Sequence, residues 1–440
     1  MISATLSNLR YSLAIQLPVD EKDAHALTLA SILTVTLTSL IFLGFLVLFG
    51  PRLFLLLNVD KFSSGFYLLP LATFLVGMGL VFNSANLRGK RFTNLALSKI
   101  IGAACDRITM LALGFYGFNI PISLITGRIL GHLTTLVTLI LSKRGYFFTA
   151  FSKESFKRLK KVALRYIDFP IYSWSGFFQQ LSVQLPVILL GYIFSPMVAG
   201  YYALSRRVLA EPIHIVSEAL CRSYYQKVSE VSDNREELYT MTKRLLHYLI
   251  LLIIFPLVLL GLSGNEFFSF AFGDQWRQAG NYASLLVPTY ITIFIARPVM
   301  VFFDLLEKQK VAFLFNSLFF LLNVTSISIG GIYNNPKLAI GLFSLTSTCS
   351  LILQIQWILS KIGFTTTILI KLFLSGISTA AIFSIPIVVV KYFMKESGLM
   401  IIIISMLSFF TFVLYIMHTD PIVREKIISL KMRIFTSNLR

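Results

Sequence analysis

The sequence predicts an all-α polytopic membrane protein with about 12 transmembrane helices, and three observations support this fold class. The 440 residues are 56% hydrophobic and only 13% charged, and their mean hydropathy is +0.77. Apolar runs of roughly the 20 residues that a bilayer requires recur along the whole chain. Short polar stretches rich in Lys and Arg separate these runs. This composition excludes an ordinary soluble domain.

Each expected helix is an apolar run that ends at charged residues, Gly or Pro. We expect helices at 26–48, 66–82, 96–118, 121–141, 170–193, 198–225, 245–262, 283–303, 311–329, 338–359, 368–390 and 399–417. The run at 66–82 is short for a span, and the run at 198–225 carries many charges. Between the runs, the longest stretches expected outside are 50–65 and 264–280.

The distribution of cations predicts the orientation of these helices. With the N-terminus in the cytoplasm, 27 of the 39 Lys and Arg residues fall on the inner side, and the opposite orientation reverses the ratio. We therefore expect both termini in the cytoplasm of a bacterium, with the helices in its inner membrane. The net charge of +19 is then a topology signal, and we expect no nucleic-acid partner.

A weak internal repeat and a basic segment predict the domain organisation. Gly65-Phe-Tyr67 and Gly280-Asn-Tyr282 each open a span that a basic turn follows, which is typical of transporters built from parallel repeats. We expect an N-terminal lobe at 1–141 with about four spans, a basic cytoplasmic linker at 142–168, a C-terminal lobe at 169–360 with about six, and two extra spans with a basic tail at 361–440. Within the linker, 153–161 is either a plain basic connection or an amphipathic helix on the anionic leaflet.

Charged residues inside spans are costly and therefore mark a cavity, a partner or a pathway. Asp106 and Arg107 are adjacent and lie mid-span, so at least one is expected to meet another helix or a lumen. Arg128 lies in the next span, four residues before His132, on one polar face. Arg297, followed by Pro298, adds a cation to the eighth span.

The sixth span carries the densest set of charges. The residues Arg207, Glu211, His214, Glu218 and Arg222 are spaced by four, three, four and four, which places them on one helical stripe. Pro212 removes a backbone donor in the middle of this helix. The stripe could line a cavity, could pair internally as Arg207–Glu211 and Glu218–Arg222, or could belong to a helix on the membrane surface.

The balance of these charges predicts an anionic cargo. The candidate substrate-binding residues are Arg107, Arg128, Arg206, Arg207 and Arg297. The candidates for binding a proton or a coupling cation are Asp106, Glu211, His214 and Glu218. Guanidinium groups match phosphate oxygens, so a pyrophosphate headgroup suits this set better than a cationic drug does.

Sites for catalysis or for a resident cofactor are not expected. The sequence has no phosphate-binding Gly-rich loop and no nucleophile elbow, and its three cysteines are far apart and fit no metal spacing. No outer stretch is long enough to hold a glycan-transferring site. We therefore expect a transporter rather than an enzyme, driven by a proton or Na⁺ gradient.

Three segments resemble the O-antigen and oligosaccharide flippases of the multidrug/oligosaccharidyl-lipid/polysaccharide exporter superfamily. They are Leu9–Pro18, the stretch from Phe169-Pro-Ile-Tyr172 to Ala199-Gly-Tyr-Tyr-Ala-Leu-Ser-Arg-Arg207 with Pro212 beyond, and Phe272-Gly-Asp-Gln-Trp276 with Ala279-Gly280-Asn-Tyr282. The resemblance implies two helical lobes that move an undecaprenyl-pyrophosphate-linked glycan by alternating access. It also implies two helices before those present here, so the first lobe is expected to be incomplete.

The resemblance implies the partners and leaves alternatives open. The expected partners are a polyprenyl-pyrophosphate-linked oligosaccharide, membrane lipids and the glycosyltransferase or polymerase machinery that makes and uses it. The alternatives are a multidrug or cation antiporter of the same superfamily, a membrane glycan polymerase or ligase, and an inactive fragment.

Overall fold

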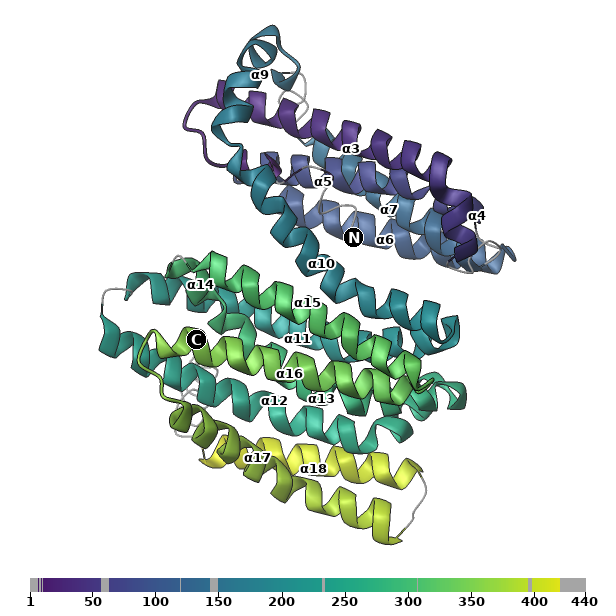
Figure 1. Ribbon diagram of the computed structural model, residues 1–440, viewed down its shortest axis with the longest axis vertical. Coiled ribbons are helices and arrows are strands. Elements are labelled where there is room, and N and C mark those ends of the chain that lie inside the picture. The colour runs from purple at the N-terminus through teal and green to yellow at the C-terminus, as the bar shows by residue number, and fades with distance from the viewer. Residues whose placement is uncertain are drawn as a thin grey trace, which may run out of the picture. The chain divides into compact units, whose positions relative to one another are not determined.

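The computed structural model of the chain describes residues 7, 9, 11–56, 63–118, 120–142, 149–231, 234–306, 308–394 and 398–419. All regular structure within these ranges is helical, which confirms the predicted all-α class (Figure 1). The chain folds into two compact units, residues 1–184 (unit 1) and residues 185–440 (unit 2). Each unit has its own buried hydrophobic core.

Unit 1 is a bundle of long helices, with α3, α5, α6 and α7 running along one direction (Figure 1). Its elements are α2 (Tyr11–Ala14), α3 (Glu21–Leu56), α4 (Ser63–Phe66), α5 (Leu69–Arg88), α6 (Phe92–Phe115), α7 (Ile120–Leu141), α9 (Lys153–Arg165) and the first part of α10 (Asp168–Ile193). Apolar residues such as Val35 of α3, Phe82 of α5 and Leu139 of α7 meet in its core. The apolar runs form helices because backbone groups in lipid must be satisfied within the segment.

Helices α6 and α7 contact each other through glycines. A Cβ atom at Gly131 of α7 would lie 2.9 Å from the carbonyl oxygen of Gly102 and 2.7 Å from Cβ of Asp106, both on α6. A Cβ atom at Gly127, one turn earlier, would lie 2.9 Å from the carbonyl oxygen of Asp106. Small residues spaced by four let membrane helices approach until their backbones touch. The crossing therefore holds Asp106 directly against α7.

The basic linker folds into helix α9. Its N-cap is Ser152, whose hydroxyl accepts a hydrogen bond from the backbone N–H of Ser155 at 3.3 Å. Val162 is buried in the core of unit 1, and the hydroxyl of Tyr11 donates to the carbonyl oxygen of Ala163 at 3.1 Å. The helix therefore packs on unit 1 and is not an extended connection.

Unit 2 is built around α13, most of whose residues are buried and which packs against α11, α12 and α16. Its further elements are α11 (Pro196–Glu230), α12 (Arg235–Phe272), the 3₁₀ turn η2 (Asp274–Trp276), α13 (Arg277–Val299), α14 (Val301–Leu305), α15 (Gln309–Ile332), α16 (Pro336–Ser360), α17 (Thr366–Val388), the π-helical turn η3 (Val389–Met394) and α18 (Gly398–Thr419). The hydroxyl of Ser205 on α11 donates to the carbonyl oxygen of Ala279 on α13 at 2.6 Å. This buried bond fixes the register of the two helices.

Nine helical segments within the described ranges are long and apolar enough to cross a membrane. They are Glu21–Arg52, Leu69–Arg88, Pro121–Leu141, Arg235–Phe272, Asp274–Phe303, Lys310–Ile332, Pro336–Ser360, Thr366–Tyr392 and Gly398–Thr419. The other three predicted spans also coincide with helices, namely α6, α10 and α11. Helices α6 and α11 are less apolar because they carry the charged residues singled out above.

The helix predicted at 245–262 is longer in the structure. Helix α12 has 38 residues and continues to Phe272, so the first half of the stretch at 264–280 is helical. Asn234 caps its start by accepting from the backbone N–H of Glu237 at 3.3 Å, and the polar residues at both ends extend the helix beyond its apolar run. A prediction that ends the helix at its last apolar residue therefore underestimates the length of such a helix.

Candidate functional site

In unit 1, two arginines face one carboxylate at the crossing of α6 and α7. Nη1 of Arg128 lies 3.2 Å from Oδ2 of Asp106, and Nη1 of Arg107 lies 3.7 Å from the same oxygen. The side chain of Asp106 is 7% exposed, and both arginines are 54% exposed. The expectation that Asp106 or Arg107 meets another helix is thus confirmed for Asp106. Two guanidinium groups around one carboxylate leave a net positive charge open to the surroundings.

The carboxylate of Asp106 retains acceptor capacity. Its Oδ1 is buried and has no hydrogen-bond partner among the residues that the structure describes. The ring of His132 interacts electrostatically with both Arg128 and Asp106, and Arg107 also donates to the sulfur of Met110 at 3.7 Å. The cluster can therefore accept a proton or a further donor at Oδ1 while Arg107 and Arg128 present cations.

In unit 2, Arg297 of α13 and His214 of α11 form a hydrogen bond. Nη2 of Arg297 lies 2.9 Å from Nε2 of His214. Because a guanidinium can only donate, Nε2 must accept, and the imidazole is then neutral with its proton on Nδ1. The electrostatic neighbours of His214 are Arg297, Glu211, Glu218 and Arg206. Four other sequence-predicted site residues therefore contribute to the electrostatic environment of this ring, and one of them, Arg297, is in direct contact with it.

The remaining predicted residue, Arg207, is exposed on α11, and no carboxylate of the described part lies within ion-pair distance of it. The internal Arg207–Glu211 bridge, one of the alternatives above, is therefore not formed. The Glu218–Arg222 alternative lies outside what is described, because the side chain of Arg222 is not. Arg206 lies on another side of the helix, where it interacts electrostatically with Tyr202 and Tyr290.

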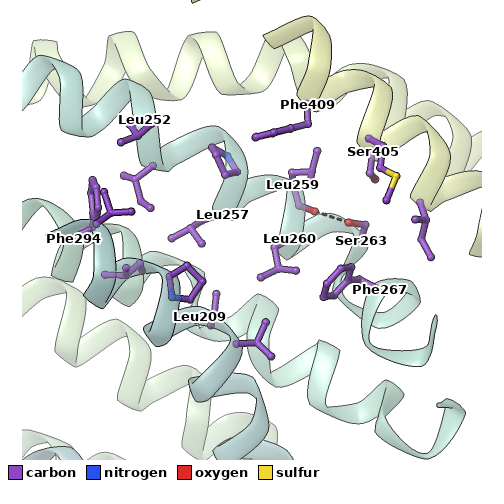
Figure 2. A pocket seen from close by; sticks show the side chains of 18 residues that line it. Leu209, Leu252, Leu257, Leu259, Leu260, Ser263, Phe267, Phe294, Ser405 and Phe409 are labelled. Atoms are coloured by element: carbon purple, nitrogen blue, oxygen red, sulfur yellow. Dashed lines mark hydrogen bonds between the residues drawn. The ribbon is translucent and has the colours of Figure 1, made fainter. Parts of the chain in front are cut away.

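The opposite face of α11 lines an apolar pocket of about 540 Å³ within unit 2 (Figure 2). The walls come from α11, α12, α13 and α18, and labelled side chains such as Leu257, Phe294 and Phe409 point into it. Pro212 and Val216 of α11 also line it, about half a helical turn away from His214 and Arg207. The only polar lining side chains are Ser263 and Ser405 among 18 residues, and Ser263 donates to the carbonyl oxygen of Leu259 at 2.8 Å.

One ion pair was missed by the sequence analysis. The side chain of Lys391 in η3 is only 19% exposed, and its Nζ lies 3.2 Å from Oε2 of Glu266 on α12. It also donates to the carbonyl oxygen of Leu262. No local pattern links residues 125 apart in sequence, so only the packing of α17 on α12 reveals the pair.

The sequence of the chain matches a known protein family. A family model described as "Polysaccharide biosynthesis protein" matches residues 14–281. No curated protein matches the sequence. Among the described ranges, no group of three or more His, Cys, Asp or Glu residues is arranged to hold a metal ion.

Several solved structures share the fold. "Lipid II flippase MurJ, inward closed conformation" has a TM-score of 0.71 at 13% identity, covering 94% of this chain and 89% of that chain. An inward-facing multidrug resistance MATE family transporter of the MOP superfamily has a TM-score of 0.61 at 14% identity, covering 82% and 86%. A MATE protein in complex with MaL6 has a TM-score of 0.53 at 12% identity, covering 82% and 85%. The chain therefore has the fold of these multi-pass membrane transporters.

Proposed function

Because this chain belongs to the family of polysaccharide biosynthesis proteins, we propose that it moves a lipid-linked oligosaccharide across the bacterial inner membrane. The cargo would be an undecaprenyl-pyrophosphate-linked glycan of the O-antigen or capsule type. The fold supports transport by alternating access, since it is shared with a lipid II flippase and with MATE transporters. Both termini would lie in the cytoplasm, as the distribution of cations predicts.

The observation that carries this proposal is the two-sided character of α11. One side bears Arg207 and His214, the latter bonded to Arg297 at 2.9 Å. The other side lines an apolar pocket through Pro212 and Val216. A lipid-linked glycan has the same two-sided chemistry, because a charged pyrophosphate joins an isoprenoid chain to the sugars. The polar side of α11 suits the pyrophosphate, and the apolar pocket suits isoprenoid units.

The charge balance favours an anion over a cationic drug. Around His214 the two arginines, Arg206 and Arg297, balance the two carboxylates of Glu211 and Glu218. Arg207 adds a cation that pairs with no carboxylate of the described residues. In unit 1, Arg107 and Arg128 outnumber Asp106. Arginine forks bind phosphate oxygens in pairs and stay protonated at all physiological pH values. A carrier of cationic drugs would instead require a surplus of carboxylates.

Coupling to an ion gradient would use the acidic groups and the imidazole. Asp106 has a buried oxygen with acceptor capacity, and His214 has its Nε2 occupied by Arg297. Glu211 and Glu218 lie near enough to influence the charge of that ring. A proton or Na⁺ taken up at one of these groups would change the balance that holds the pyrophosphate, and so reset the carrier.

The test is glycan export in cells that lack their own flippase and carry variants of this chain. Arg297→Ala and Arg207→Ala together should abolish surface glycan while the protein stays in the membrane. Arg277→Ala is the matched control, since Arg277 pairs with Asp274 at 3.2 Å at the start of α13, away from His214. Full export by the double variant would overturn the cationic site.

The same cells distinguish the other functions. Loss of a flippase leaves the lipid-linked glycan on the inner leaflet, whereas loss of a polymerase leaves single repeat units at the surface. Loss of dye efflux with normal surface glycan would indicate a drug antiporter instead. Accumulation of inner-leaflet glycan in the double variant is the result that we expect.

A further inference from the structure

Helix α9 of unit 1 has an outer face that no part of the described chain covers. This outer face consists of the exposed cations Lys153, Lys157, Lys160, Lys161 and Arg165 together with the exposed apolar residues Phe156, Leu164 and Ile167. The three apolar side chains are 52%, 58% and 43% exposed. Phe156, Lys160 and Leu164 are each four residues apart and so form a single stripe on α9, and Ile167 lies in the turn that follows the helix.

The inner face of α9 is firmly attached. Nη1 of Arg158 lies 2.7 Å from Oδ2 of Asp20 and 2.8 Å from Oδ1 of Asp23, at the start of α3. Val162 is buried in the core of unit 1. Because these contacts point inward, the helix cannot turn its outer face toward the protein without losing them. The outer face of α9 therefore stays exposed to the surroundings of unit 1.

The charge of the outer face is purely positive. The only carboxylate on α9 is Glu154, and it is bound at 2.8 Å by Lys22 and at 3.6 Å by Arg158. None of the five outer cations has a carboxylate partner among the described residues. An anionic partner fits such a surface, and each basic residue near an anionic membrane strengthens attraction roughly fivefold.

The two ion pairs of Arg158 with Asp20 and Asp23, here called the clamp, indicate where this partner lies. Asp20 and Asp23 stand at the start of α3, and the segment of α3 that is long and apolar enough to cross a membrane begins at Glu21. Helix α9 is thus fixed at the end of a helix that can cross a membrane. In Figure 1, α9 lies at the end of the helices of unit 1 and beside α3. Apolar side chains flanked by lysines at this position are typical of a helix that lies in the membrane interface.

We propose that the outer face of α9 binds anionic phospholipid headgroups, with Phe156, Leu164 and Ile167 entering the acyl boundary and the lysines contacting phosphates. This would anchor unit 1 to the lipid surface through a helix that is already clamped to α3. The proposal does not depend on the cargo, because it concerns a surface and not the charged groups of α11.

The test uses the full chain in lipid nanodiscs. Trp174, Trp276 and Trp357 are replaced by Phe, and Phe156→Trp then provides the only fluorescent reporter. Its quenching is compared between discs with brominated phosphatidylglycerol and discs with brominated phosphatidylcholine at equal mole fraction. We expect stronger quenching by the brominated anionic lipid. A protein that keeps Trp276 as its only tryptophan is the control reporter, and it should show no such preference.

Variants that remove lysine charges show whether the preference for the anionic lipid depends on α9. Lys153→Gln, Lys157→Gln, Lys160→Gln and Lys161→Gln together should remove the preference for the anionic lipid. Four changes elsewhere, Lys308→Gln, Lys310→Gln, Lys361→Gln and Lys371→Gln, lower the net charge equally and should leave it intact. Equal quenching by both lipids would overturn headgroup recognition. Absence of quenching by either lipid would also overturn the proposal, because the face would then contact water or a protein.

Discussion

In unit 1, Arg107 and Arg128 face the carboxylate of Asp106, whereas in unit 2 Arg297 donates to the neutral imidazole of His214. In the first cluster the acceptor is a carboxylate that two guanidinium groups share. An imidazole can take up a proton, and a protonated ring has no nitrogen left to accept the bond from Arg297. The comparison teaches that similar arginines share a carboxylate in one unit and bind a neutral imidazole in the other.

Disrupting the glycine crossing of unit 1 should have the largest effect. Gly131→Leu would force side-chain atoms into the carbonyl of Gly102 and the Cβ of Asp106, which lie 2.9 and 2.7 Å from a Cβ atom. We expect a loss of more than about 3 kcal/mol of stability, because backbone atoms cannot move aside. The measurement is the thermal unfolding of the detergent-purified protein. Gly114→Leu is the matched control, since a Cβ atom there meets nothing within 4 Å; equal losses in both would contradict the close contact.

Asp106→Asn tests the shared carboxylate of unit 1. The amide keeps the shape of the side chain but removes the charge that Arg128 and Arg107 share, so we expect a loss of about 2 kcal/mol. Thermal unfolding again reports the change. Arg107→Gln should cost less, because Arg107 lies 3.7 Å from the carboxylate and is half exposed. A loss for Arg107→Gln as large as that for Asp106→Asn would show that Arg128 is not the main partner.

The pair of Arg297 and His214 in unit 2 can be tested by keeping or removing its acceptor. His214→Gln retains an oxygen that can accept from Arg297 but does not titrate, whereas His214→Ala leaves Arg297 without an acceptor. We expect His214→Ala to lower the rate of glycan export by about tenfold, in line with one charge-assisted hydrogen bond. His214→Gln should keep export at neutral pH and make it independent of pH between roughly 5 and 8. A pH dependence unchanged in His214→Gln would remove His214 from the coupling step.

The smallest expected effect concerns the clamp of α9. The backbone N–H of Lys22 and then Arg158 lower the pKa of Asp20, and Lys22 and then Arg158 lower the pKa of Glu154. A lowered pKa in the folded state means that the clamp contributes stability above the unfolded value of roughly 4 and loses it as the pH falls further. We therefore expect α9 to stay docked at pH 5–8 and to loosen only below about pH 4.

The anisotropy of a dye on Lys153→Cys, with the native cysteines replaced, measures this docking. It should stay constant at neutral pH and fall in acid. Arg158→Gln should already lower it at neutral pH. Constant anisotropy down to pH 3 would show that Val162 and Tyr11 alone hold the helix.

Much of the fold could be predicted because apolar runs of bilayer length form helices wherever they occur. The contact of Asp106 with another helix followed from the cost of an isolated charge, and the two faces of α11 followed from helical periodicity. The clamp of Arg158 on Asp20 and the pair of Lys391 with Glu266 could not be predicted, since each joins residues more than 100 positions apart. Arg206 and Arg207 are neighbours in sequence and point about 100° apart on α11, but the tyrosines near Arg206 are known only from the packing.

Backbones that touch cannot slide past each other. Most helix pairs are separated by a layer of side chains, and small changes of rotamer in that layer allow shear. At Gly102, Gly127 and Gly131 a Cβ atom would lie 2.9 Å from a backbone oxygen of the other helix, so we expect α6 and α7 to move together. Asp106, Arg107 and Arg128 would then keep the same spacing in any movement of unit 1. The contacts within this charged group would then not have to break and form again when unit 1 moves.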